Sequence, residues 1–338
     1  MMLGVALGLL SGCAEQGAVN DHFFVRSGDA VLPVQVRGNA GSGTVVLYES
    51  GGPSGPAIAE RLIETLAFAE PLEEEVALAF YDRRGVGNAH GDYTEEDLSI
   101  KDYLGDLHAI QQVLRERYAP DRVVLMGHSW GGQVTARYLM KHPNAVDAWV
   151  PIAGVMMVGD DLYIPYRRDF TCRVADEQEQ LHPGQAIWSE MLDWCEANPI
   201  VEPDSKEKDE LWEYLSVIYD RLGGEPESPT GPLLSAVFGS MYNLIDTFRD
   251  AGVSEQLFNE LRDDDLLPEL GQITLPTLVV SGEYDDTIPV ELGDEVFERI
   301  DTPPDQKRHL VIEGGGHYPF DAAPKAFNEA VLELIDRL

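Results

Sequence analysis

The spacing of short apolar runs constrains the fold of this chain more than any other feature of its sequence. These runs, rich in Val, Leu, Ile and aromatic residues, are 44–48, 77–81, 122–126, 148–152, 276–281 and 309–312. Stretches with helical spacing of apolar residues lie among and after them, at 99–118, 132–141 and 325–338. A strand that is apolar along its whole length needs cover on both faces, as in parallel sheets packed between helices. The pattern predicts an α/β fold with a mostly parallel sheet and helices on both faces.

The stretch from 156 to 270 interrupts this rhythm. It is rich in Trp, Tyr and acidic residues, contains the turn-prone segment 223–232 (GGEPESPTGP), and otherwise has a mostly helical pattern. We therefore expect a helical lid at 156–270, inserted between two parts of one core at 14–155 and 271–338. The 338 residues are enough for such a core and lid.

The first twelve residues, MMLGVALGLLSG, form an uncharged apolar run of signal-peptide length that is too short to span a bilayer. It ends in Leu10-Ser11-Gly12-Cys13, which resembles the lipobox of bacterial lipoproteins, whose Cys sulfur carries a lipid. The resemblance implies a signal peptide at 1–12, lipidation of Cys13, and an exported, membrane-anchored protein. A secretory signal with a periplasmic or secreted product is one alternative. A cytosolic protein is another, because no Lys or Arg precedes the run; the true start could also lie upstream of Met1.

Two further cysteines, Cys172 and Cys195, lie close together in the sequence. In an oxidising compartment they could form a disulfide that closes a loop of about 24 residues, which stabilises a fold by roughly 3 kcal/mol. Two buried thiols are the alternative. No CxxC pair or His/Cys cluster with metal-ligand spacing occurs, so we expect no metal.

The chain is strongly acidic, with 60 Asp and Glu against 24 Lys and Arg and a net charge of −36. Nucleic-acid backbones and anionic lipid surfaces repel such a protein. We therefore expect no nucleic-acid partner, and membrane attachment only through a lipid on Cys13. Because salt screens self-repulsion, the composition suits a salty medium. An acidic surface that only serves solubility is the alternative.

The sequence Gly127-His128-Ser129-Trp130-Gly131-Gly132 follows one strand run and precedes a helical stretch. This is a G-x-S-x-G motif in its required context, in which a sharp strand-to-helix turn lifts the serine hydroxyl above the sheet. Small residues must flank the serine because the turn brings the strand and the helix close together. The motif predicts Ser129 as a nucleophile, and we expect His128 to serve local packing.

A serine nucleophile needs a base that is oriented by an acid, and α/β hydrolases supply them in the order Ser, Asp or Glu, His. Asp285 follows the run 276–281, and His317 follows the run 309–312. Both lie where strands end, which is where active sites of open α/β sheets form. We predict His317 as the base and Asp285 as the acid, with the neighbouring Asp286 as an alternative acid. A surface-loop role is the alternative for His317.

Hydrolysis also needs donors for the developing oxyanion. The backbone N–H of Trp130, directly after the nucleophile, is one candidate. The loop ESGGPSGP at 49–56 follows another strand run, and its glycines allow close approach to a substrate. We choose the N–H of Gly52 as the second donor; an ordinary Gly/Pro turn is the alternative.

Five motifs in the same order resemble the α/β-hydrolase superfamily, and within it the proline iminopeptidase-like branch of serine peptidases. They are SGGPSG at 50–55, DRRGVGNA at 82–89, GHSWGG at 127–132, GEYDDTIP at 282–289 and GGGH at 314–317. Ser50, Arg83 and Ala89 stand where that branch usually has His, Gln and Ser. None of these departures removes a reacting group, so hydrolysis is retained while the fine positioning is open.

The resemblance implies a cofactor-free aminopeptidase that removes an N-terminal residue, proline included. It also implies that lid glutamates hold the free amine of the substrate, with Glu213 and Glu196 as candidates and solvated side chains as the alternative. A carboxylesterase or lactonase on the same triad is the second candidate, so the substrate is a small molecule, a peptide or an ester. A non-catalytic ligand-binding lipoprotein is the third. Dehalogenases and epoxide hydrolases need a carboxylate where this chain has Ser129.

Overall fold

The computed structural model describes residues 17–62, 66–92, 94, 98–223 and 253–338. In these residues one nine-stranded sheet has the order β1-β2-β4-β3-β6-β7-β8-β9, with β5 beside β2. The pairs from β4 to β9 along this order are parallel, while β1, β2 and β5 pair antiparallel. The strands are β1 (Ala18–Ser27), β2 (Ala30–Asn39), β3 (Thr44–Glu49), β4 (Ala77–Tyr81), β5 (His90–Gly91), β6 (Arg122–His128), β7 (Ala148–Ile152), β8 (Thr277–Gly282) and β9 (Lys307–Ile312).

The six apolar runs of the sequence are the parallel strands β3, β4 and β6 to β9, and the predicted α/β fold is confirmed. Successive residues of a strand point to opposite faces of the sheet. In β3, Val45 and Leu47 accordingly pack into one core, while Val46 and Tyr48 pack into another. This is why such a strand is apolar at successive positions rather than at alternate ones.

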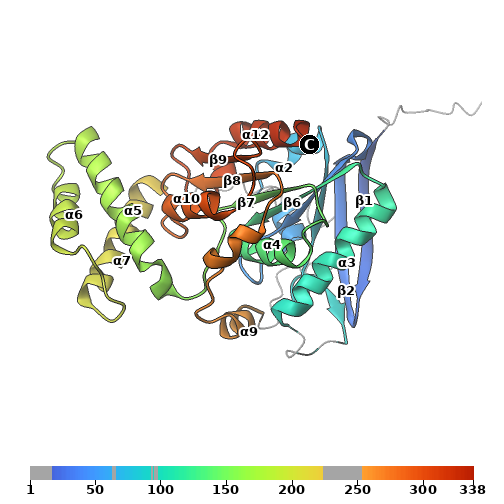
Figure 1. The fold of residues 1–338 in the computed structure, drawn as a ribbon, viewed down its shortest axis with the longest axis horizontal. Helices are drawn as coiled ribbons and strands as arrows, with labels where there is room; N and C mark the ends of the chain where they lie inside the picture. The colour runs from blue at the N-terminus through green and yellow to red at the C-terminus, as the bar shows by residue number, and fades with distance from the viewer. Residues whose placement is uncertain (1–16, 63–65, 93, 95–97, 224–252) are drawn as a thin grey trace, which may run out of the picture.

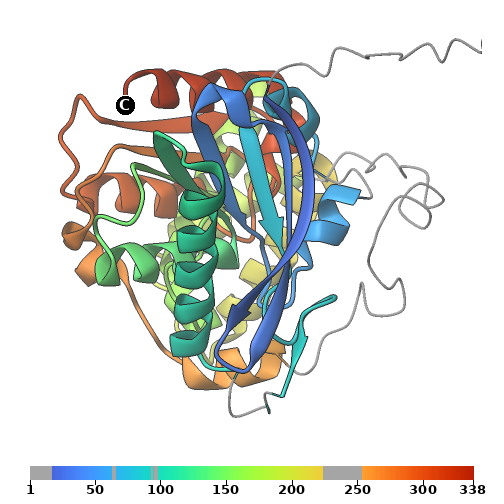
Figure 2. The same cartoon turned by 90° about the vertical axis from the view of Figure 1, so that its right-hand side faces the viewer.

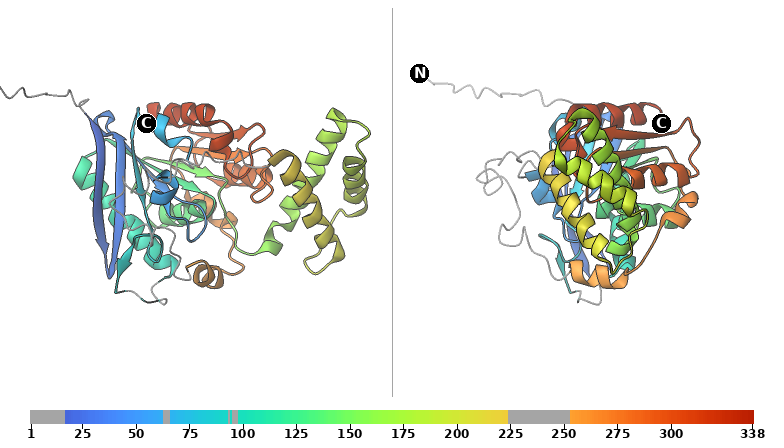
Figure 3. Two further views of the ribbon diagram at one scale, coloured as in Figure 1. Left: turned by 180° about the vertical axis from the view of Figure 1, so that it is seen from behind. Right: turned by 90° about the vertical axis from the view of Figure 1, so that its left-hand side faces the viewer.

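Helices cover both faces of the sheet (Figures 1 and 3). Residues of α3, α4 and α10 belong to the first core, and residues of α2 and α12 belong to the second. The N-cap Ser99 begins α3 by accepting a hydrogen bond from the Asp102 N–H. The helices of the core are α1 (Ala57–Leu62), α2 (Ala69–Glu73), α3 (Ile100–Tyr118), α4 (Trp130–Lys141), α10 (Val290–Arg299), α11 (Pro319–Ala322) and α12 (Pro324–Asp336), with a 3-10 turn η1 (Ala40–Ser42).

An N-terminal hairpin, β1 and β2, extends the sheet at one edge (Figure 2). The sequence patterning did not predict it as part of the sheet. The strand β1 is mostly exposed or half-buried and has no continuous apolar run. Its pairing depends on the turn between Ser27 and Ala30, where Gly28 adopts φ +55°.

The segment expected to form the lid contains three helices that project from the core (Figures 1 and 3). They share a core of their own around Phe170, Trp188 and Leu211. Residues 224–252 lie outside the described residues. After them the chain packs on the main core again, through Leu257 and Leu270. The elements of the segment are α5 (Asp160–Leu181), α6 (Ala186–Ala197), α7 (Lys206–Ile218), η3 (Tyr219–Gly223), α9 (Val253–Glu260) and η4 (Leu267–Gln272).

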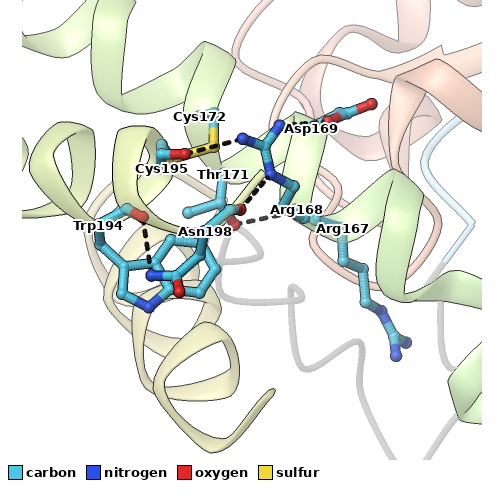
Figure 4. Close-up of a disulfide and its surroundings, with 8 residues drawn as sticks. All are labelled: Arg167, Arg168, Asp169, Thr171, Cys172, Trp194, Cys195 and Asn198. Carbon is cyan, nitrogen blue, oxygen red and sulfur yellow. Dashed lines mark hydrogen bonds and ion pairs between the residues drawn. A yellow bond between two sulfur atoms is a disulfide. The ribbon is translucent and has the colours of Figure 1, made fainter. Parts of the chain in front are cut away.

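A disulfide joins Cys172 of α5 to Cys195 of α6 (Figure 4). Beside it, the Arg168 guanidinium donates hydrogen bonds to the carbonyl oxygens of Cys195 (2.9 Å) and Asn198 (3.0 Å). These carbonyls lie at the end of α6, where a helix has no internal donors left for them. The disulfide and this cap hold the same two helices together.

The predicted signal peptide and Cys13 lie outside the described residues. Among the residues that the structure describes, no helix has both the length and the apolar character needed to cross a bilayer.

Candidate active site

Ser129 lies at the turn between β6 and α4. Its backbone has φ +51°, a conformation that L-residues rarely adopt and that marks a strained turn. A Cβ atom on Gly131 would lie 2.3 Å from the carbonyl oxygen of Glu49, so only glycine fits beside this turn. The Ser129 N–H donates to the Ile152 carbonyl of β7 at 2.9 Å, which ties the turn to the sheet.

A row of hydrogen bonds connects Ser129, His317 and Asp285. The Ser129 hydroxyl lies 2.9 Å from Nε2 of His317, and Nδ1 of His317 lies 3.0 Å from Oδ2 of Asp285. Because the carboxylate accepts the proton on Nδ1, Nε2 is left to accept the serine proton. The fully buried Asp285 also accepts backbone hydrogen bonds from Thr287 (3.0 Å) and Ile288 (2.8 Å), which fix its carboxylate.

The neighbouring carboxyl of Asp286 is partly buried and lies near His317 without taking the place of Asp285. Burial and the charge of Asp285 raise the pKa of Asp286 to about 6. The structure therefore brings Asp285, rather than the alternative Asp286, into the row with His317.

His128 packs beneath this row. Its ring lies 4.6 Å from the ring of Tyr318 and 5.1 Å from that of His317, between centroids. Its Nε2 donates to the backbone carbonyl of His317 at 2.9 Å. Burial lowers the pKa of His128 to about 3, so its ring is neutral at physiological pH. The packing role expected from the sequence thus includes a contact that holds the His317 backbone, which the motif alone does not reveal.

The glycine-rich loop after β3 passes directly against the nucleophile. A Cβ atom on Gly51 would lie 3.3 Å from Cβ of Ser129 and 2.8 Å from Nδ1 of His128. Gly52 follows on the same loop, and Trp130 is the first residue of α4, where a backbone N–H has no partner within its own helix. The two backbone groups predicted as oxyanion donors therefore lie on the two segments that meet at Ser129.

Arg83, noted in the sequence only as a departure from a motif, contacts this loop. Its guanidinium is 1% exposed and donates to the Gly52 carbonyl oxygen at 2.8 Å. The opposite donor, Trp130, packs its ring edge-to-face with Phe258 of α9, at 5.2 Å between centroids. Sequence spacing gave no signal for either contact.

Glu213 on α7 and Glu196 on α6 are exposed. Their exposure agrees with the alternative of solvated side chains, because a carboxylate that holds a substrate amine gains most when it is buried. Within the described residues, no three His, Cys, Asp or Glu side chains are grouped so that they could hold a metal ion.

A sequence model of the alpha/beta hydrolase fold family matches residues 44–324. The proline iminopeptidase of Heyndrickxia coagulans is 23% identical over 304 residues, which are 88% of this chain and 92% of that protein. The pimeloyl-[acyl-carrier protein] methyl ester esterase of Edwardsiella ictaluri is 25% identical over 267 residues, 78% of this chain and 85% of that protein. A solved esterase from a Rhodococcus species superposes with a TM-score of 0.59 at 21% identity, and the match covers 93% of this chain and 98% of that one.

The family model matches most of the chain, and the mostly parallel sheet agrees with it. The chain therefore belongs to the alpha/beta hydrolase fold family.

Proposed function

We propose that this protein is a serine hydrolase in which Ser129 is the nucleophile, His317 the general base and Asp285 the acid that orients the imidazole. The observation that carries the proposal is the unbroken row of hydrogen bonds, 2.9 Å from Ser129 to His317 and 3.0 Å from His317 to Asp285. Nucleophile and base within hydrogen-bond reach, with the base held by a third group, is the geometry that activates a serine.

In the reaction, the Ser129 oxygen attacks the carbonyl carbon of the substrate while His317 takes the hydroxyl proton. The N–H groups of Trp130 and Gly52 stabilise the negative charge that develops on the carbonyl oxygen. His317 then gives its proton to the leaving amine or alcohol, and an acyl group remains on Ser129. Water, deprotonated by the same imidazole, attacks this ester, and return of the proton to Ser129 releases the acid.

We propose that the substrate is a peptide or amide with a free N-terminal amine, from which the enzyme removes the first residue. The proline iminopeptidase among the relatives supports this choice. The partly buried carboxyl of Asp286, close to His317, supports a cationic group near the reacting bond. Glu213 and Glu196 stay predictions for this role.

An ester or lactone substrate is the second candidate, because a methyl ester esterase is also among the relatives. Proline p-nitroanilide, its N-acetylated form and short p-nitrophenyl esters distinguish the two. An aminopeptidase turns over the free-amine anilide at least about tenfold faster than the N-acetylated one, since losing one ion pair to a partly buried carboxylate changes a rate by that order. Fast turnover of esters with no preference for a free amine contradicts the peptidase proposal.

The nucleophile itself is tested with a fluorophosphonate probe, which reacts with activated serines. We expect the wild-type protein to be labelled and the Ser129→Ala variant to stay unlabelled, with the same circular dichroism spectrum. Equal labelling of the two proteins contradicts Ser129 as the nucleophile. No labelling of the folded wild-type protein favours a non-catalytic, ligand-binding role.

We further propose that the protein is exported and carries a lipid on Cys13. The disulfide between Cys172 and Cys195 supports an oxidising compartment. Metabolic labelling with palmitate and detergent phase partitioning test the anchor. We expect the Cys13→Ala variant to lose the label and to move to the aqueous phase; an unlabelled wild-type protein contradicts the proposal.

A further inference from the structure

The guanidinium of Arg83 packs against the loop that carries Gly52. Arg83 follows β4 directly after Asp82, and its side chain is buried. Its Nη2 lies within donating distance of three successive backbone carbonyl oxygens, those of Ser50 (3.0 Å), Gly51 (3.2 Å) and Gly52 (2.8 Å). One charged side chain therefore fixes the turn of the loop at the point where it meets Ser129.

Ser50, on the loop itself, makes further contacts with Arg83. We call Arg83, Ser50 and the three loop carbonyl groups the clamp. Its hydroxyl accepts a hydrogen bond from Nη2 of Arg83 at 2.6 Å and donates to the Gly55 carbonyl oxygen at 2.7 Å. Ser50 and Arg83 are two of the three positions that depart from the resembling motifs, and here they contact each other. A small hydroxyl at position 50 leaves room for the longer, charged side chain at position 83, so the two form one unit.

The charge of Arg83 is balanced on the side away from the loop. Its Nε lies 3.2 Å from Oε1 of Glu49, which is fully buried and also accepts a hydrogen bond from the Tyr81 hydroxyl. Hydrogen bonds add to this buried ion pair, from the Tyr81 hydroxyl to Oε2 of Glu49 and from Nη2 of Arg83 to the loop carbonyls. Nη1 of Arg83 has no hydrogen-bond partner among the described residues. The cation therefore stays in place beside the loop in a region of low dielectric.

The Gly51 carbonyl and the Gly52 N–H belong to the same peptide group. A charged donor on the carbonyl oxygen draws electron density from the peptide and makes its N–H a stronger hydrogen-bond donor. The same contact fixes the direction in which that N–H points. Both effects act on a negative charge that is present only while the substrate carbon is tetrahedral.

We propose that Arg83 is a positioning residue that orients and polarises the Gly51–Gly52 peptide, so that its N–H stabilises the oxyanion. This inference rests on the proposed serine-hydrolase function. Because the oxyanion exists in the transition state and not in the bound substrate, losing the clamp lowers kcat and leaves KM nearly unchanged. Removing an oxyanion donor outright costs about 10²–10³ in kcat, so weakening one should cost about 10- to 100-fold.

The test compares Arg83→Gln with the double variant S50H/R83Q, which puts the motif pair in place of the clamp. We expect R83Q to lower kcat about 10- to 100-fold with KM within about twofold. The Ki of phenylboronic acid, which forms a tetrahedral adduct with an activated serine, should rise along with the loss in kcat. The double variant should recover most of the kcat, because the histidine and glutamine can fix the loop together.

Arg84→Gln is the matched control. Arg84 is the next residue, is also buried, and pairs with Asp106 (2.8 Å) rather than with the loop. R84Q also removes a buried arginine charge, and it should leave kcat and the boronate Ki near the wild-type values. Arg83→Lys keeps the positive charge, but the single ammonium group of lysine cannot contact both Glu49 and the loop. This variant should therefore also lower kcat at constant KM.

Wild-type kcat in folded R83Q overturns the proposal, as does an R84Q defect of the same size or a boronate Ki that does not follow kcat. If R83Q does not fold, R83K decides by the same measurements. Failure of the proposed function gives a different result. If the fluorophosphonate probe does not label the wild-type protein, both proposals are contradicted. A labelled, active wild-type protein with fully active Arg83 variants removes only this one.

Discussion

His128 couples the stability of the protein to pH. Burial lowers its pKa to about 3 in the folded state, whereas an unfolded histidine titrates near its ordinary value of about 6.5. The unfolded chain therefore binds this proton first as the pH falls. The contribution of His128 is fully present above about pH 6.5 and is lost between there and pH 3, at up to about 1.4 kcal/mol per pH unit.

We expect the free energy of unfolding in urea to fall less steeply between about pH 7 and pH 4 in His128→Gln than in the wild-type protein. The glutamine amide can still donate to the His317 carbonyl but has no proton to gain. His90→Gln, at an exposed site, is the control and should keep the wild-type slope. Identical slopes in all three proteins contradict a buried, neutral His128.

The two neighbouring aspartates after β8 differ in their contacts, so their substitution should affect the kinetics differently. Asp285 orients His317 through Nδ1, so Asp285→Asn should favour the wrong tautomer and lower kcat by about 10³–10⁴. Asp286→Asn removes only a nearby charge, and we expect a change of about tenfold or less, mostly in KM. Steady-state kinetics on the two variants decides this; an equal loss in both contradicts the assignment of Asp285.

At these positions the sequence limits the candidate site residues to a few, and the backbone of the folded chain decides between them. Strand ends and motif order are enough to predict Ser129, His317 and an aspartate at 285 or 286. The choice between the two aspartates depends on the turn in which the Thr287 and Ile288 N–H groups bind Asp285. The role of Arg83 could not be predicted, because its contacts join two loops more than thirty residues apart.

Among the elements, the helices α5 and α6 of the expected lid are joined by a disulfide. It closes a loop with a sequence separation of 23 residues, and such a crosslink stabilises a fold by about 3 kcal/mol. We expect the double variant C172S/C195S to raise amide hydrogen exchange in α5 and α6 and to leave β3, β6 and β7 unchanged, since α5, α6 and α7 share a core of their own.

The wild-type protein in a thiol reductant should show the same local change, which separates loss of the crosslink from an effect of the serines. Faster exchange spread evenly over the sheet contradicts the expectation that α5 and α6 unfold separately from the sheet. No change in either helix means that the Arg168 cap and the packing around Trp188 hold them without the crosslink.

Elements differ in how far their sequences predict them. The parallel strands inside the sheet, such as β3 and β7, are buried at every position, and a run that is apolar on both faces is typical of such strands. The hairpin β1–β2 lies at an edge with one strand largely exposed or half-buried, so its residues show a weaker pattern. The sequence pattern identifies α5, α6 and α7 as helical, but how they pack together depends on contacts around Phe170 and Leu211 that no periodicity encodes.

Over the whole molecule, the net charge of −36 destabilises the folded state, and ion pairs compensate for it only at single sites. Pairs such as Arg61 with Glu73 and Arg84 with Asp106 neutralise single buried carboxylates. With 60 acidic and 24 basic residues, the carboxylates far outnumber the side chains that could neutralise them one to one. Their mutual repulsion is relieved when the chain expands on unfolding, so it favours the unfolded state.

Salt should therefore stabilise this protein. The Debye length falls from about 10 Å at 0.1 M to about 3 Å at 1 M, which screens repulsion between surface carboxylates more than it weakens the buried pairs. We expect Tm to rise by several degrees between about 0.05 M and 0.5 M NaCl, where screening dominates over effects of the salt on apolar hydration. Sucrose at matched osmolality, which does not screen charge, should produce a smaller rise. A Tm that stays flat or falls over this range contradicts the interpretation of the acidic composition as suited to a salty medium, and favours an acidic surface that serves solubility alone.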